Sequence, residues 1–135
     1  MPYTLAHPAA ILPIYRWAAP YTSITALAIG SMAPDFVYFV PLPVTGAQSH
    51  SLPGIFWFCL PSGFLLWLLL HFFLKPPMLA FLPPGMGTRL AALLANNKRM
   101  RGFNWQSAGV LALSLGLGAL THIVWDAFTH WNTIV

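Results

Sequence analysis

The chain has no glutamate, one cysteine and very few charged residues of any kind. Charged residues make up 6% of its 135 residues, whereas a soluble domain carries about 25%. So few charges cannot cover the surface of a water-soluble globule, and 58% of the residues are hydrophobic. The composition therefore argues against an ordinary soluble domain and favours lipid as the solvent.

The scarce residues exclude further classes of protein. Cys59 is the only cysteine, so no internal disulfide can form and the redox compartment is left open. The net charge is +4, but five of the six basic residues lie in or beside residues 75–106. This clustering fits the rule that cytoplasmic loops of membrane proteins are positive better than it fits nucleic-acid binding. The N-terminus lacks a basic segment before its apolar stretch, so no secretory signal is predicted.

Three apolar stretches are predicted to cross a membrane, which takes about 20 mostly apolar residues. They cover about residues 22–40, 54–74 and 107–128. The segment Leu5 to Trp17 is too short to cross and is predicted to form a re-entrant or interfacial helix. We therefore expect an all-α membrane protein, a single integral membrane domain over residues 1–135. Its place would be the bacterial inner membrane, multi-pass, with residues 75–106 in the cytoplasm.

Both acids, Asp35 and Asp126, lie inside apolar stretches. An ionisable group at such a position costs about 2.5–3.5 kcal/mol and usually has a function. His122, Asp126 and His130 follow one another at intervals of four residues, and each step of four rotates a helical side chain by only about 40°. All three therefore share one helix face. A histidine and a carboxylate one turn apart can bind one zinc ion. His130 lies about 12 Å along the helix axis from His122, so it is expected to sit in the second shell around the ligands or to bind a second ion.

The predicted topology brings more polar residues to the same side of the membrane. Asp126 lies about 29 Å along a helix that starts at Ser107, which is close to the outer interface. Asp35 lies towards the outer end of its own stretch, and the N-terminal helix can fold back towards it. We therefore expect His7, Asp35, His50, His122 and Asp126 to converge on one side of the membrane.

Simpler roles stay open for each of these residues. His122 and Asp126 can form an ordinary hydrogen bond between helices, and Asp35 can be satisfied by backbone N–H groups after Pro34. The segment around His50 can cap the next helix through its serines, and His7 can be incidental near a terminus. His71, alone in an apolar stretch, is expected to have a packing role.

Four segments of the chain together resemble a bacterial family of multi-spanning membrane proteins of unknown function. They are YTLAHPAAILP, IGSMAPDF, SHSLPGIF and THIVWDAFTH. That family is related to the predicted membrane-bound metal-dependent hydrolases, which share an early His, an Asp after Pro, a His flanked by Ser, and H-x-x-x-D. The pattern is also similar to zinc-dependent phospholipase C. The resemblance implies a ligand set of His7, Asp35, His50, His122 and Asp126.

Two departures from the resemblance matter. Members of that family are generally longer after the last motif, so we expect this chain to be a shortened copy. Phospholipase C uses further ligands, including a glutamate, for three zinc ions. The absence of glutamate here predicts one metal ion, or at most two.

The sequence therefore predicts a metal-dependent hydrolase that acts at the membrane interface on a lipid-linked ester or phosphoester. Its cofactor would be a divalent metal, with zinc expected, and Asp35 or Asp126 would accept the proton of the attacking water. The bilayer and a lipid-linked substrate are the expected partners. The alternative is a membrane protein without enzymatic activity. It would be a proton or metal-ion pathway, which needs a homo-oligomer because three helices seldom enclose one, or an inactive remnant.

Overall fold

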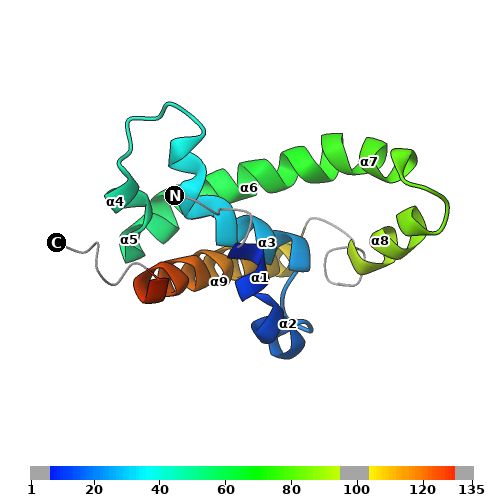
Figure 1. Cartoon of the computed structure of the whole chain (residues 1–135), viewed down its shortest axis with the longest axis horizontal. Helices are drawn as coiled ribbons and strands as arrows, with labels where there is room; N and C mark the ends of the chain where they lie inside the picture. The colour runs from blue at the N-terminus through cyan, green and yellow to red at the C-terminus, as the bar shows by residue number, and fades with distance from the viewer. Residues whose placement is uncertain (1–6, 95–103, 130–135) are drawn as a thin grey trace.

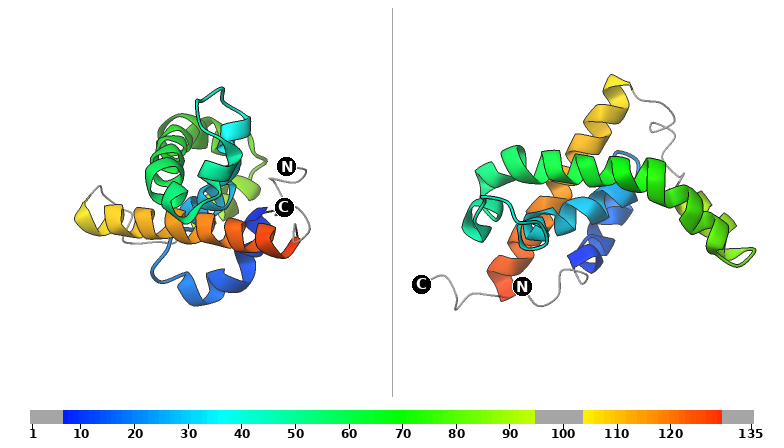
Figure 2. Two further views of the ribbon diagram at one scale, coloured as in Figure 1. Left: turned by 90° about the vertical axis from the view of Figure 1, so that its left-hand side faces the viewer. Right: turned by 90° about the horizontal axis from the view of Figure 1, so that it is seen from above.

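The structure, a computed structural model, describes residues 7–94 and 104–129, and within these ranges every regular element is a helix. Two long helical rods cross each other, and short N-terminal helices pack beside the crossing (Figures 1 and 2). Both rods, Leu52–Phe81 and Trp105–Thr129, are long and apolar enough to cross a membrane. The predicted all-α class is confirmed for the described residues, with two such rods instead of the predicted three.

The first predicted span, residues 22–40, is wrong as a membrane-crossing helix. The chain forms α3 (Ile24–Met32), nine residues long, and continues in a six-residue 3-10 helix (Ala33–Tyr38), which together fall short of about 20 residues. Pro34 has no N–H for the carbonyl of Gly30, and the N–H of Ala33 bonds to that carbonyl instead. This hydrogen bond spans three residues instead of four, which is the pattern of the tighter 3-10 helix.

The N-terminal segment forms two short helices, α1 (His7–Ala10) and α2 (Leu12–Ala18). The chain turns after α2, where the N–H of Tyr21 bonds to the carbonyl of Ala18. Helix α1 packs against α3 and against α9 (Trp105–Thr129). This packing buries His7 at the first residue of α1.

The rod Leu52–Phe81 is one continuous helix, and its prolines set its local geometry. It consists of α5 (Leu52–Gly54), a π-helical turn (Ile55–Cys59), α6 (Leu60–Leu68), a second π-helical stretch (Leu69–Leu74) and α7 (Lys75–Phe81). Pro61 and Pro76 lack the N–H that closes an α-helical turn, and each π stretch ends two residues before one of them. The Ser62 hydroxyl donates to the carbonyl of Phe58, at 2.6 Å. The helix therefore continues beyond residue 74, where the predicted span ends.

The remaining helices are α8 (Met86–Leu94) and α9. Helix α8 follows a turn at Gly85, whose φ of 92° suits glycine. It packs against α7 at the end of the molecule that lies far from α4 (Gly46–Ser49) and α5 (Figure 1). Helix α9 begins after Asn104, whose side chain accepts a hydrogen bond from the N–H of Ser107 while the Ser107 hydroxyl accepts one from the N–H of Asn104. This reciprocal cap fixes the start of the helix.

Helix α9 lies very close to α3. A methyl group on Gly30 or on Gly118 would press into the backbone of the facing helix, so only glycine permits this approach. The hydroxyl of Ser114 also accepts a hydrogen bond of 2.9 Å from the N–H of Ser23, just before α3 begins. These contacts fix the position of α9 along α3 and place its last turns beside the 3-10 helix.

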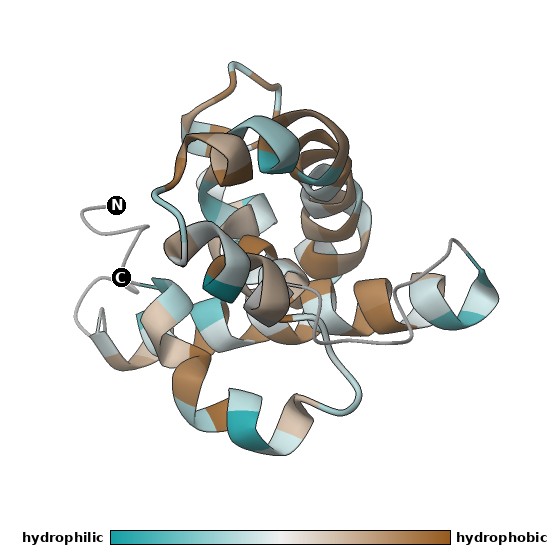
Figure 3. Ribbon diagram, turned by 90° about the vertical axis from the view of Figure 1, so that its right-hand side faces the viewer, coloured by the Kyte–Doolittle hydropathy of each residue, from teal (hydrophilic) through white to brown (hydrophobic). Residues whose placement is uncertain are grey.

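Much of the apolar side-chain surface of the two rods faces outward. In the most apolar 18-residue stretch of the Leu52–Phe81 helix, only 28% is buried, and in the corresponding stretch of α9 44% is buried. Phe56, Leu65 and Phe73 on the Leu52–Phe81 helix are each about seven-tenths exposed, and Figure 3 colours much of that helix as hydrophobic. Such a surface suits contact with lipid.

Candidate metal centre

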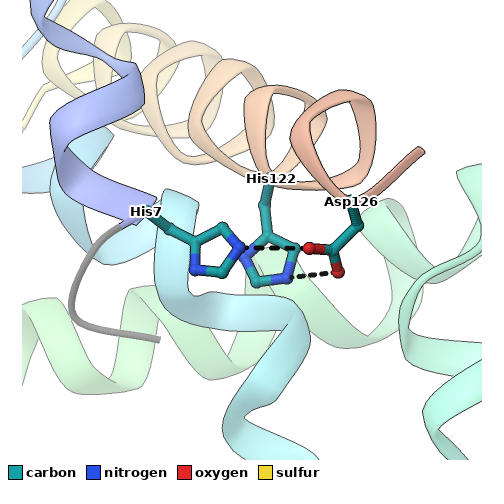
Figure 4. A group of neighbouring side chains, drawn as sticks. All are labelled: His7, His122 and Asp126. Atoms are coloured by element: carbon teal, nitrogen blue, oxygen red, sulfur yellow. Dashed lines mark hydrogen bonds and ion pairs between the residues drawn. The ribbon is translucent and has the colours of Figure 1, made fainter. Parts of the chain in front are cut away.

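Five of the polar residues singled out in the sequence converge near the C-terminal end of α9. His122 and Asp126 lie in the last two turns of α9, and His7 opens α1 (Figure 4). Asp35 comes from the 3-10 helix, and His50 directly follows α4. Four separate elements therefore contribute to one cluster.

The imidazole of His122 is fixed by a backbone carbonyl of the neighbouring helix. Its Nδ1 lies 2.6 Å from the carbonyl oxygen of Ser31, one of the last carbonyls of α3, to which Pro34 offers no N–H. A carbonyl only accepts hydrogen bonds, so Nδ1 carries the hydrogen and the neutral ring keeps its lone pair on Nε2. The side chain is fully buried, which holds that lone pair in one direction.

His50 is oriented in the same way by α4. Thr45 and Gln48 cap this helix reciprocally, and the carbonyl of Gly46 in its first turn lies 2.9 Å from Nδ1 of His50. Nδ1 therefore donates to this carbonyl, and Nε2 again carries the lone pair of the neutral ring. The Ser49 hydroxyl lies 3.1 Å from the same Nδ1 and supports the orientation.

The two Nε2 atoms face each other and the carboxylates of both aspartates. They are 3.2 Å apart. Nε2 of His50 lies 3.3 Å from Oδ1 of Asp35 and 3.5 Å from Oδ2 of Asp126. Nε2 of His122 lies 3.6 Å and 3.2 Å from the same two oxygens. Ligand atoms about 2.0–2.2 Å from a tetrahedral zinc ion lie about 3.3–3.6 Å from one another, so these separations suit ligands of one ion.

The cluster requires positive charge at its centre. When the histidines are neutral, the four facing atoms are all hydrogen-bond acceptors. Burial alone lowers the pKa of His50, but its hydrogen bonds to Asp35 and to the Gly46 carbonyl, with the charges of Asp35 and Asp126, raise that pKa overall. Either a proton or a metal ion can supply the positive charge, and both imidazoles are already oriented as metal ligands.

His7 approaches the cluster from α1. Its ring stacks on that of His122, with centroids 3.8 Å apart and planes 13° apart, and its Nε2 lies 3.2 Å from Oδ1 of Asp126 (Figure 4). Two groups of three could hold a metal ion, namely His7 with His122 and Asp126, and Asp35 with His50 and His122. His122 belongs to both groups and has a single free nitrogen, so it can bind only one ion. The two groups therefore describe one centre, with Asp126 offering an oxygen to each side.

Among the described residues, the members of the cluster differ in how far they reach the surface. The side chains of His122 and Asp35 are 0% and 5% exposed, whereas those of His50 and Asp126 are 22% and 26% exposed. The ring of Tyr38, half exposed, lies 6.3 Å from that of His50. Within the cluster, His50 and Asp126 are therefore the side chains more accessible from the surface.

Two other histidines were assigned roles from the sequence. His71 lies on the long helix, away from the cluster, and stacks on Trp67 at 4.8 Å, in agreement with a packing role. His130 lies outside the described residues. The carbonyls of Ser31 and Gly46, which orient the two imidazoles, were not anticipated, because every residue has a carbonyl and only the tertiary fold selects one.

The fold and the cluster define the class, an all-helical protein with a candidate metal centre at one end of two long apolar helices. A family described as a domain of unknown function, DUF4184, matches residues 1–135, and the chain belongs to that family. No curated protein and no solved structure matches the chain. The functional inference therefore depends on the chemistry of the cluster.

Proposed function

We propose that this protein is a metal-dependent hydrolase whose centre lies at a membrane interface. The observation that carries the proposal is the orientation of His50 and His122, whose Nε2 atoms face each other and two carboxylates. Histidines that bind metals almost always donate their other N–H to a carbonyl or carboxylate, and both rings do so here. Imidazole nitrogens with carboxylate oxygens suit zinc.

We place the chain in the bacterial inner membrane as a multi-pass protein, with both rods crossing the bilayer. Helix α9 has 25 residues, about 37 Å of helix against a hydrocarbon core of about 30 Å. Asp126 lies about 32 Å along the axis from Trp105, and His50 directly precedes the other rod. Both residues then fall at one interface, opposite the basic residues between 75 and 101, which the positive-inside rule assigns to the cytoplasm.

The residues divide into those that hold the ion and one that exchanges protons. A zinc ion bound here would lower the pKa of a coordinated water from about 15.7 to about 7. Asp35, His50 and His122 would hold the ion. Asp126, the more exposed acid, accepts the proton that the water gives up. Asp35 can take this role when it is not bound to the ion.

The expected substrate is a lipid-linked ester or phosphoester. Its reacting group would lie at the depth of the headgroups, next to His50 and Asp126. The resemblance of the chain to predicted membrane-bound hydrolases supports the same reaction class. This substrate class follows from position and from likeness to other proteins.

The rival function is a proton or metal-ion pathway through an oligomer. Clusters of His and Asp inside membranes also serve transporters. A pathway needs access from both sides, and the side chain of His122 is fully buried, whereas those of His50 and Asp126 are partly exposed. This difference in exposure favours a site that binds a substrate and releases it to the same side.

The proposal is tested by metal content and hydrolysis in the same preparations. Protein purified in detergent should contain about one zinc ion per chain and release product from extracted bacterial membrane lipids. His122→Ala should lose both, whereas His71→Ala, which removes an imidazole from the long helix, should keep both. Equal zinc content in all three proteins would contradict a metal centre at His122. Bound zinc without hydrolysis would contradict the enzyme.

A further inference from the structure

Resting on the proposed function, we infer that this centre cleaves a carboxylic ester of a membrane lipid and not a phosphoester. The elements that form the cluster are α1, the 3-10 helix, α4 and α9, and none of them contains a lysine or an arginine. Enzymes that bind phosphate esters stabilise the phosphoryl oxygens with arginine, lysine or several metal ions. The cluster has no such side chain in the elements that build it.

The basic residues lie in other parts of the chain. Arg16 is on α2, while Lys75 and Arg89 are on α7 and α8, at the far end of the molecule from α4 and α5 (Figure 1). The other three, Lys98, Arg99 and Arg101, precede α9 in the sequence. His122 lies about 26 Å along α9 from Trp105. Among the described basic residues, none therefore lies on an element that contributes a side chain to the cluster.

The charge of the proposed centre does not compensate for their absence. One Zn²⁺ with Asp35 and Asp126 ionised has no net charge, and the single free nitrogen of His122 limits the centre to one ion that uses this ligand. A phosphodiester carries a negative charge and would enter beside Asp126, the exposed acid. Like charges placed together cost several kcal/mol in a binding site. A carboxylic ester is uncharged and enters without this repulsion.

Exposed aromatic side chains lie close in the sequence to both aspartates of the cluster. Tyr38 ends the 3-10 helix that carries Asp35 and Phe39 follows it, and they are 49% and 62% exposed. Trp125 and Phe128 stand on either side of Asp126 in the sequence and are also exposed. Aromatic side chains of this kind favour the boundary between lipid and water. An ester carbonyl lies at this boundary in a lipid, with its acyl chain directed into the apolar layer.

The reaction uses water as its only other reactant. The water oxygen forms a bond to the carbonyl carbon while a site carboxylate takes the proton that the water loses. The bond between that carbon and the alcohol oxygen then breaks, and the proton passes to the departing oxygen. The products are a fatty acid and an alcohol.

A binding experiment tests the charge preference without turnover. Cobalt replaces zinc in purified protein, and its visible absorption reports on ligands added to the centre. Octanamide is uncharged and carries a carbonyl, whereas octyl phosphate has the same chain length and an anionic head. Because like charges disfavour the phosphate, the amide should bind at least about tenfold more tightly. Equal or tighter binding of octyl phosphate would overturn the inference, and His122→Ala controls for cobalt bound elsewhere.

Product analysis then tests the reaction itself. Zinc-loaded protein is placed in phosphatidylcholine vesicles that also contain diacylglycerol, so carboxylic and phosphoric esters are both present. Free fatty acid, absent with His122→Ala, supports the inference. Release of phosphocholine or phosphatidic acid instead would overturn it and leave the hydrolase proposal standing. If zinc binds and neither bond is cleaved, both the inference and the hydrolase proposal fail.

Discussion

The substitution Gly118→Ala should separate α9 from α3 and weaken the metal centre. A methyl group at this position would press into the backbone of Leu27 and Ser31. Backbone atoms cannot rotate away, so the helices must move apart by about 1 Å to restore an ordinary contact of about 3.5 Å. The same movement stretches the 2.6 Å hydrogen bond between His122 and the Ser31 carbonyl to about 3.6 Å, beyond hydrogen-bond range.

Two magnitudes follow from this movement. Overpacking costs about 1–3 kcal/mol of stability, and loss of a group that orients a metal ligand costs about 10–100-fold in metal affinity. The matched control is Gly116→Ala, two residues earlier on α9, where an added methyl group meets nothing within 4 Å. This control should be as stable as the wild type or more so, because alanine in a helix is favoured over glycine by about 0.5–1 kcal/mol.

Thermal unfolding in detergent and a zinc titration against a coloured chelator measure both quantities. Gly118→Ala should unfold at a lower temperature and bind zinc more weakly than Gly116→Ala. If the two variants unfold at the same temperature and bind zinc equally, the close helix crossing does not position His122, and this reasoning is refuted.

Three further predictions concern the ligands and the membrane. Asp35→Asn keeps the shape of the side chain but removes its charge, so zinc affinity measured by titration should fall at least about 100-fold; unchanged affinity would exclude Asp35 as a ligand. His7→Ala should retain one zinc ion per chain with affinity reduced about 10–100-fold, because His7 contacts Oδ1 of Asp126, whereas His50 and His122 face Oδ2. Complete loss of zinc would make His7 a direct ligand. A reporter fused near Asn97 should behave as cytoplasmic, and periplasmic behaviour would invert the orientation.

The convergence of the site could be anticipated from local patterns and helix ends. Residues four apart on a helix face one way, so His122 and Asp126 were expected together, and the structure has their facing atoms 3.2 Å apart. Asp35 and His50 were expected beside them because each lies near the same end of an apolar stretch. Burial of ionisable residues in an apolar chain is costly, so the small number and the grouping of these residues already indicated a site.

Other features depend on backbone hydrogen bonds that sequence patterns do not specify. Hydropathy treated residues 22–40 as one span, but Pro34 changes the hydrogen bonding and the apolar helix covers only Ile24–Tyr38. The predicted span ended at residue 74, yet a π-helical stretch precedes Pro76 and the helix continues to Phe81. The carbonyl that orients His122 comes from a different helix, so only the packing of α3 on α9 reveals it.

The most direct test of the central claim is X-ray absorption at the zinc edge on the protein purified in detergent. The proposed centre predicts a first shell of nitrogen and oxygen at about 2.0–2.1 Å, with outer-shell scattering from two imidazoles. His122→Ala should abolish this signal, and His71→Ala should leave it unchanged. A sulfur shell at about 2.3 Å, or an oxygen shell without imidazole scattering that persists in His122→Ala, would contradict a metal centre formed by His50, His122 and the two aspartates.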